Sequence, residues 1–144
     1  MPVRRLVFAA NWKMNLSSEE ARDFVSCLLP QVKGAAAELI IFPPAVYLAQ
    51  VATDTKHTAV GVGAQNIFWE REGAYTGEIS AAMARDCGAG YALAGHSERR
   101  HYFNESAEMV TRKARAAQAG GLIPLICVGE TLEERVERLR REEA

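Results

Sequence analysis

Short apolar runs alternate with helix-forming segments along the whole chain, and this alternation limits the possible folds more than any other feature. The predicted strands are Leu6–Ala10, Leu39–Phe42, Val60–Gly63, Tyr91–Ala94 and Leu122–Val128. The predicted helices lie near 17–33, 45–53, 79–87 and 105–119, and from 131 to the end of the sequence. Strands that are apolar without a break are typical of parallel sheets covered by helices. The sequence therefore predicts an α/β fold in which a βα unit occurs five times.

Residues at the helix ends support these boundaries. Ser17 and Thr131 are predicted helix caps, because a hydroxyl can accept a hydrogen bond from the first helical turn. Glycine follows three of the helices, at positions 34, 88 and 120–121, where a left-handed residue ends a helix. Ion pairs on a solvated face of the last helix are predicted at two spacings of four residues, Glu134–Arg138 and Glu137–Arg141.

Two architectures accommodate five βα units. A doubly wound five-stranded sheet is complete at 144 residues, whereas an eight-unit barrel needs about 250 residues. Apolar residues make up 49% of the chain and charged residues 24%, which is typical of a globular domain. No linker or low-complexity tract divides the chain, so residues 1–144 are predicted to belong to one domain. Periodicity alone leaves both architectures open.

Polar side chains gather just after the predicted strands, at the edge where parallel α/β folds place their functional sites. They are Asn11 and Lys13 after the first strand, Gln65-Asn66 after the third, His96 to Glu98 after the fourth and Glu130 after the fifth. Strand alternation predicts that Asn11 and Lys13 point the same way. Lys13 could hold a phosphate or a developing oxyanion, or it could be an ordinary surface lysine.

The segment Ala94–Arg100 places a histidine where a short helix begins. Backbone N–H groups and the positive helix end disfavour a charged imidazole there, so His96 could act as a neutral hydrogen-bond donor. It could equally be a helix cap or a core histidine. Glu98 could hold Lys13 as its charged partner, or it could be an ordinary acid of the first helical turn. Arg99 is predicted to form a salt bridge or to lie in an interface.

The predicted loop from Gln65 to Glu78 is long for a connection between a strand and a helix, and such loops are usually functional. It is expected to expose Phe68, Trp69 and Tyr75, which are suited to anchoring a partner. The alternative is an Ω-loop that packs on itself.

Composition argues against several functional classes. The net charge of −1 gives no electrostatic case for nucleic acid or an anionic membrane, and the longest apolar run contains Pro43-Pro44 and is too short to span a bilayer. The three cysteines are widely spaced and form no CxxC motif, which favours reduced thiols in a cytosolic protein. A metal site is not expected. The segment Gly61–Gly63 fails as a dinucleotide-binding fingerprint, because Asn66 replaces the third glycine.

Four segments together resemble the triosephosphate isomerase family. They are Asn11-Trp12-Lys13-Met14-Asn15, Gly73-Ala74-Tyr75-Thr76-Gly77-Glu78-Ile79-Ser80, Gly95-His96-Ser97-Glu98-Arg99-Arg100 and Cys127-Val128-Gly129-Glu130. They occur in the family's order and near its spacing. The resemblance implies a (β/α)8 TIM barrel that interconverts dihydroxyacetone phosphate and glyceraldehyde 3-phosphate without cofactor or metal. It also implies a cytoplasmic homodimer of glycolysis and gluconeogenesis.

The resemblance further implies individual roles for residues of this chain. Asn11 and Lys13 would bind the substrate, and Lys13, His96 and Glu98 would be the catalytic set. In that set Lys13 stabilises negative charge, His96 is the neutral electrophile and Glu98 positions Lys13. The loop carrying Thr76 would reach a second subunit, with Glu78 and Arg99 as partners across the dimer interface.

The chain departs from the family pattern in one large respect. The family's catalytic base is a glutamate after the sixth strand, followed by a lid and by phosphate-binding loops after strands seven and eight, and none of these occurs in residues 1–144. We therefore expect the amino-terminal part of a single barrel domain, lacking strands six to eight. Such a chain is expected to be inactive and prone to self-association. The alternative is a non-catalytic pseudoenzyme or an interaction partner of intact isomerase subunits.

Overall fold

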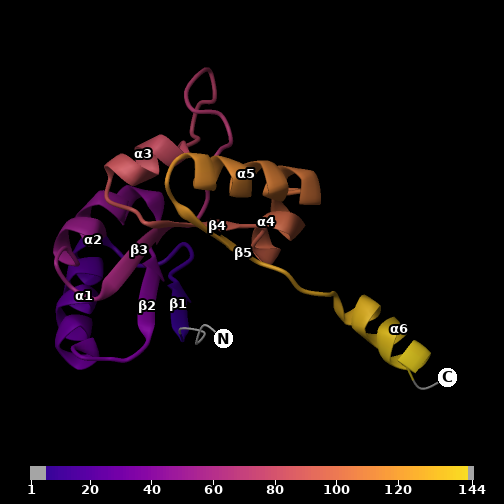
Figure 1. The fold of residues 1–144 in the computed structure, drawn as a ribbon, viewed down its shortest axis with the longest axis horizontal. Coiled ribbons are helices and arrows are strands. Elements are labelled where there is room, and N and C mark those ends of the chain that lie inside the picture. The colour runs from indigo at the N-terminus through magenta and orange to yellow at the C-terminus, as the bar shows by residue number, and fades with distance from the viewer. Residues whose placement is uncertain (1–5, 143–144) are drawn as a thin grey trace, which may run out of the picture.

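Five parallel strands form one sheet whose spatial order is the order along the chain. The computed structural model describes residues 6–142. Its strands are β1 (Val7–Asn11), β2 (Glu38–Phe42), β3 (Val60–Ala64), β4 (Tyr91–Ala94) and β5 (Ile123–Ile126). All neighbouring pairs are parallel and the order is β1-β2-β3-β4-β5. A doubly wound sheet would reverse its strand order at a switch point, so this sheet is a segment of a barrel. Figure 1 shows how it curls between β1 and β5.

The helices occur where the sequence predicts them, with shifted boundaries. They are α1 (Ser18–Val32), η1 (Ala45–Tyr47, a 3-10 turn), α2 (Leu48–Asp54), α3 (Ala81–Asp86), α4 (Ser97–Tyr102), α5 (Ala107–Ala119) and α6 (Leu132–Glu142). The predicted helix 105–119 begins two residues late, because Ser106 is its N-cap and accepts a hydrogen bond from Met109 N–H at 3.2 Å. The fifth strand ends at Ile126 rather than Val128. Residues 143 and 144 of the last predicted helix lie outside the described residues.

Both predicted caps are confirmed and form reciprocal capping boxes. Ser17 Oγ accepts from Glu20 N–H at 3.3 Å, and the Glu20 carboxylate accepts from Ser17 N–H at 2.7 Å. The hydrogen bond that the Ser17 N–H donates to the Glu20 carboxylate is the main reason that the pKa of Glu20 lies below its ordinary value. Thr131 and Glu134 repeat the arrangement at 3.1 and 2.7 Å. Each box satisfies two N–H groups that a helix start would otherwise leave unpaired.

The main core lies between the sheet and the helices. Figure 1 shows α1, α2, α3 and α5 along the outer side of the strands. One apolar cluster joins these helices to the side chains that alternate outward from β2, β3 and β4. It includes Val25, Ile41, Val51, Val62, Ala84, Ala92 and Ala117. Trp12 belongs to the same cluster and packs edge-on against Phe24 at 5.3 Å between ring centroids.

Large side chains on the inner face of the sheet lie beside glycines of β3. Ile40, Phe42 and Leu93 form a second cluster there, flanked by Tyr91. A Cβ atom on Gly63 would lie 2.9 Å from Cβ of Tyr91 and closer still to the ring of Phe42. The inner face is therefore filled over β3 by aromatic rings from neighbouring strands, and a side chain at Gly63 has no room.

The prediction that Leu6–Ala10 forms a buried strand is wrong in its burial. Residues 6–10 are all exposed, and Phe8 retains 60% of its accessible surface. On the opposite edge of the sheet, Ile126 is 51% exposed. Strands β1 and β5 are the edges of the sheet, each paired with a single neighbour in the described part of the chain. An apolar pattern predicts that a strand can be covered, and within residues 6–142 the side chains of residues 6–10 and of Ile126 stay largely accessible.

Helix α6 lies apart from the rest of the molecule (Figure 1), and all its described residues are exposed. The predicted Glu137–Arg141 ion pair is present. The predicted Glu134–Arg138 pair is wrong: Glu134 caps the helix start, and Arg138 instead contacts Glu130 at 3.0 Å and Glu142 at 2.8 Å. Within residues 6–142, no helix combines the length and the hydropathy needed to cross a bilayer.

Candidate active site

Lys13 leaves the sheet through a left-handed turn after β1. Asn11 is the last residue of the strand, and Lys13 has a φ of +56°. Asn11 Oδ1 accepts a hydrogen bond from Lys13 N–H at 2.9 Å. Asn11 and Lys13 were predicted to share a direction through strand alternation, but the direction of Lys13 is set by this turn. Lysine adopts positive φ rarely, because its Cβ crowds the backbone there.

The amide of Gln65 ties this turn to the neighbouring strand ends. Its Nε2 donates to the carbonyl oxygens of Lys13 and Phe42, both at 2.8 Å. The Phe42 oxygen also accepts from Trp12 N–H at 3.1 Å. The carboxyl ends of β1, β2 and β3 are therefore held together by one side chain.

His96 follows β4 through Gly95, whose φ is +76°, and is the N-cap of α4. Its Nδ1 accepts a hydrogen bond from Glu98 N–H at 3.3 Å. In this cap Nδ1 is the hydrogen-bond acceptor of the ring. The helix-cap interpretation of His96 is thus confirmed, and the cap leaves an N–H donor on the other nitrogen.

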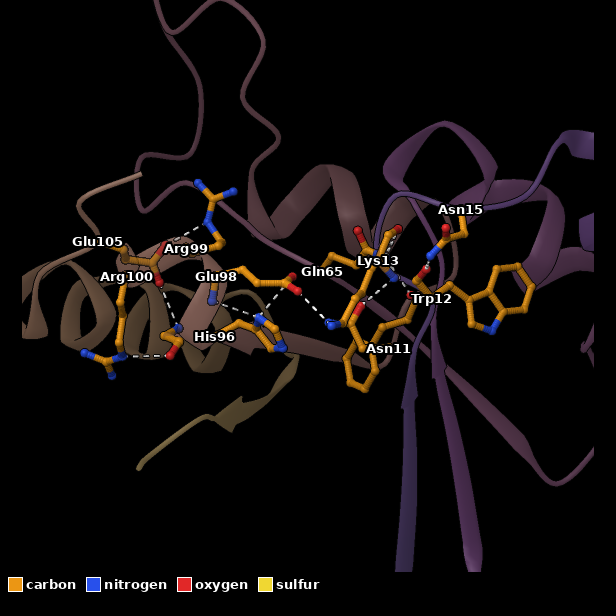
Figure 2. A network of polar contacts seen from close by, with 12 residues as sticks. Asn11, Trp12, Lys13, Asn15, Gln65, His96, Glu98, Arg99, Arg100 and Glu105 are labelled. Carbon is orange, nitrogen blue, oxygen red and sulfur yellow. Dashed lines mark hydrogen bonds and ion pairs between the residues drawn. The ribbon is translucent and has the colours of Figure 1, made fainter. Parts of the chain in front are cut away.

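Lys13 and Glu98 meet across the strand ends. Lys13 Nζ lies 2.7 Å from Glu98 Oε1, and Figure 2 shows the two side chains pointing toward each other between the turn after β1 and α4. The hydrogen bond from Lys13 holds the pKa of Glu98 below its ordinary value, with a smaller contribution from the charge of Lys13. The second Glu98 oxygen lies 3.5 Å from His96 Nδ1. Both members of the pair are solvent-accessible, at 52% and 40%.

The predicted substrate-binding and catalytic residues therefore converge. Asn11, Lys13, His96 and Glu98 line one pocket of about 300 Å³, to which Gln65 and Asn66 also contribute. The pocket combines an ammonium and a guanidinium group, an imidazole, amide groups and the carboxylates of Glu78 and Glu98 at a sheet edge. This set can bind an anionic ligand and stabilise negative charge on an oxygen atom. Within residues 6–142, no group of three or more His, Cys, Asp or Glu side chains is placed to hold a metal ion.

A buried charge cluster behind the pocket is absent from the sequence predictions. Lys113 Nζ lies 2.6 Å from Glu105 Oε2 and 2.7 Å from Asn66 Oδ1, and the Lys113 and Glu105 side chains are 3% and 1% exposed. Glu105 also accepts from Gly95 N–H at 2.8 Å, next to His96. One pattern could have indicated this cluster: Lys113 lies on the helix face of α5 that also carries its buried residues, and a buried lysine requires a partner.

Arg99 contributes to the same cluster. Its Nε donates to Glu105 Oε2 at 2.8 Å, so the predicted salt bridge forms within the chain. Glu78, its predicted partner across a dimer interface, accepts a hydrogen bond of 3.4 Å from Asn66 Nδ2. Thr76 is exposed in the loop between β3 and α3, which projects from the body in Figure 1.

That loop packs partly on itself. The Phe68 ring lies 4.1 Å from that of Trp69 and 4.5 Å from that of Tyr75, and the Arg112 guanidinium lies 4.1 Å above Trp69. Phe68 and Trp69 are half-buried as a result, and Tyr75 is exposed. The expected exposure is therefore confirmed for Tyr75 and wrong for Phe68 and Trp69, which the internal packing of the loop partly covers.

Glu130, the polar residue predicted to follow the fifth strand, serves the segment after β5. Its carboxylate contacts Arg138 of α6 at 3.0 Å, and this hydrogen bond holds the pKa of Glu130 below its ordinary value. Cys127 lies beyond the strand end with the other two cysteines also free. Burial raises the pKa of the Cys127 thiol, which is the behaviour of a packed cysteine rather than a nucleophile.

Comparisons with known proteins agree with this geometry. A family model described as triosephosphate isomerase matches residues 6–143. The chain is 48% identical over 135 residues to the triosephosphate isomerase of Thermoanaerobacter pseudethanolicus, covering 94% of this chain and 54% of that protein. It is 51% identical over 134 residues to the one from Rubrobacter xylanophilus, covering 92% and 52%.

A solved structure shows the same fold. The crystal structure of triosephosphate isomerase from Bartonella henselae superimposes with a TM-score of 0.88 at 36% identity, covering 97% of this chain and 61% of that one. The chain thus spans about half the length of the relatives it matches. On the family match, the sequence identity and the shared strand order, this chain is a member of the triosephosphate isomerase family.

Proposed function

We propose that this chain supplies the amino-terminal part of a triosephosphate isomerase barrel, without strands six to eight, and with it half of the active site. The reaction would interconvert dihydroxyacetone phosphate and glyceraldehyde 3-phosphate. The observation that carries the proposal is the 2.7 Å contact between Lys13 and Glu98 beside His96, in a pocket at the carboxyl edge of the sheet. The names of the matched relatives give the substrate class.

The proposed chemistry is a proton transfer between two carbon atoms through an enediolate. Negative charge develops on an oxygen atom of the substrate, and the Lys13 ammonium stabilises it at short range. His96 donates a hydrogen bond from Nε2 to the same region, which its neutral state permits. Asn11 binds the substrate, and Glu98 holds Lys13. Fixed groups of this kind lower the barrier because they need no reorganisation during the reaction.

We propose that residues 1–144 alone have no useful isomerase activity. The four site residues bind and polarise the substrate, and the proposed set contains no carboxylate free to remove the carbon-bound proton, because Glu98 is paired with Lys13. Loss of a general base commonly lowers the rate by about 10²–10⁴. An incomplete grip on the phosphate adds to this loss, because the substrate is less well oriented.

The test uses chain purified from a host that lacks its own isomerase. We expect isomerisation at the level of a buffer blank, together with dihydroxyacetone phosphate binding detected by phosphorus NMR and lost in Lys13→Met. The exposed Lys33→Met serves as the matched control. Turnover above the blank that disappears in His96→Gln would refute the inactivity, and binding unaffected by Lys13→Met would refute the site.

A second candidate function is favoured by the projecting loop. We propose that Thr76, Glu78 and Arg99 belong to a dimer interface, through which a non-catalytic chain could also bind intact isomerase subunits. The exposed Tyr75 beside the stacked Phe68 supports this. Sedimentation of the chain alone measures dimerisation, and sedimentation with intact isomerase measures binding to intact subunits. Tyr75→Ser is the variant compared with the parent chain in both experiments. A cytoplasmic location in glycolysis and gluconeogenesis belongs to the same proposal, and the three free cysteines are consistent with a reducing compartment.

A further inference from the structure

Gln65 uses one amide group to bind two backbone carbonyls from different strands. Its Nε2 donates to Lys13 O and to Phe42 O, each at 2.8 Å, across 52 and 23 positions of sequence. Two carbonyl acceptors select the NH2 end of the amide, because the oxygen end would face them repulsively. Figure 2 shows Gln65 beside the Lys13 backbone, between the turn after β1 and Glu98.

The Lys13 backbone needs such a restraint. At a φ of +56° it occupies a region that non-glycine residues adopt at a cost, and such conformations persist only where surrounding contacts impose them. Both polar groups of its backbone are held by side chains: the N–H by Asn11 Oδ1 at 2.9 Å and the C=O by Gln65. No ladder of the sheet includes Lys13, since β1 ends at Asn11.

The contact with Glu98 depends on this conformation. Lys13 starts from the end of β1 and reaches α4, on the far side of the pocket. A return to an ordinary negative φ would turn the side chain at its root and carry the ammonium away from Glu98. The Asn11 bond restrains only the N–H side of the residue, so the carbonyl side depends on Gln65.

We propose that Gln65 is a positioning residue, which holds Lys13 in its left-handed conformation and thereby places the ammonium group in the pocket. The part of this inference that concerns catalysis, that Gln65 matters for isomerisation, rests on the function proposed above. The structural part, that Gln65 sets the contact between Lys13 and Glu98, stands without any substrate.

The test follows the Glu98 carboxylate by carbon NMR during a pH titration of the full chain without ligand. Lys13→Met defines the endpoint at which the contact is lost and the pKa of Glu98 rises. We expect Gln65→Ala and Gln65→Glu to move the pKa of Glu98 more than half of the way to that endpoint. Gln65→Glu is the sharper variant, because it keeps the shape and removes both donors.

Gln50 provides a matched control. It also donates to a main-chain carbonyl, that of Ser18 at 3.1 Å, and accepts from the Ser18 hydroxyl at 2.7 Å, at a site outside the pocket. Gln50→Ala should leave the pKa of Glu98 unchanged. An unchanged Glu98 titration in folded Gln65→Glu would overturn the inference, because a purely structural glutamine would not affect this carboxylate selectively.

A double variant covers the case in which Gln65→Ala fails to fold. Glycine adopts positive φ freely, so Lys13→Gly removes the need for the restraint. The fall in the urea midpoint caused by Gln65→Ala should be smaller in the Lys13→Gly background, or folding should be rescued there. Equal falls in both backgrounds, or no rescue, would overturn the inference.

Binding of dihydroxyacetone phosphate separates this inference from the proposed function. A Glu98 shift in a chain that does not bind dihydroxyacetone phosphate supports the positioning role of Gln65 and refutes the proposed site. Binding that requires Lys13, together with an unchanged Glu98 titration in Gln65→Glu, supports the proposed site and refutes the positioning role of Gln65. Where both hold, Gln65→Glu should weaken dihydroxyacetone phosphate binding in the same direction as Lys13→Met.

Discussion

Substitution of Lys113 by methionine tests whether the buried charge cluster stabilises the fold. The Lys113 ammonium is enclosed between Glu105 Oε2 at 2.6 Å and Asn66 Oδ1 at 2.7 Å. Methionine fills nearly the same space but donates no hydrogen bond. Lys113→Met therefore removes one charge of a buried pair and leaves Glu105 in place, 1% exposed, with its carboxylate partly unsatisfied.

The expected loss of unfolding free energy is about 3 kcal/mol. Removing one partner of a buried ion pair costs about 3–5 kcal/mol, because the remaining charge stays desolvated. Glu105 keeps its bonds from Arg99 Nε and Gly95 N–H, both at 2.8 Å, so the low end of that range applies. Since a domain of this size is stable by about 5–15 kcal/mol, the loss is a large part of the total.

Urea unfolding followed by circular dichroism measures this loss. Parent and variant are compared at one protein concentration, because self-association would make apparent stability depend on concentration. The exposed Lys33→Met is the control and should change stability by less than about 0.5 kcal/mol. A loss below about 1 kcal/mol for Lys113→Met would refute the reasoning, because it would mean that the cluster is solvated or dispensable.

The same comparison has a predicted pH dependence. Burial raises the pKa of Glu105, but hydrogen bonds from Lys113, Arg99 and Gly95 N–H outweigh it, so the pKa lies below its ordinary value. A lowered pKa in the folded state contributes stability that is present above the unfolded pKa of about 4.3 and is lost as pH falls through the folded value. The stability gap between parent and Lys113→Met should therefore be widest near neutral pH and should narrow in acid.

Two further predictions concern the sheet interior and α6. Gly63→Ala should lower stability by about 1–3 kcal/mol, since the new Cβ would overlap the ring of Phe42, whereas Gly129→Ala, with no atom within 4 Å, should be neutral in urea unfolding. Arg138→Met should raise the pKa of Glu130 toward its ordinary value, as read from a carboxylate NMR titration, and an unchanged pKa would show that Arg138 is not its partner in solution.

The order of strands and helices could be predicted because it depends on local patterns. The Ser17 hydroxyl followed by Glu20 indicates a helix start by chemistry confined to one turn, and the capping box forms as expected. The alternation of apolar runs with helical segments likewise needs no knowledge of distant residues. Even so, periodicity alone left the barrel segment and the doubly wound sheet open, and the strand order decided between them.

The remaining features depend on contacts between distant positions. The positive φ of Lys13 is stabilised by Gln65, 52 residues away, and no local pattern indicates it. The exposure of Phe8 could not be predicted, because an apolar run does not say whether an element covers it. Lys113 was overlooked for a different reason: its partner Glu105 is the first residue of the predicted helix 105–119, whereas in the structure it precedes the helix and is buried.

The separation of α6 from the sheet makes it a small folding unit of its own. A helix of 11 residues is marginal in water, so its order depends on its own capping box and ion pairs rather than on the core. Its amide hydrogens should exchange through local opening, faster than those of β2 or β3, and added salt should speed this exchange by screening the charges. Proteases that cut after arginine should therefore remove this helix first and leave the five strands intact.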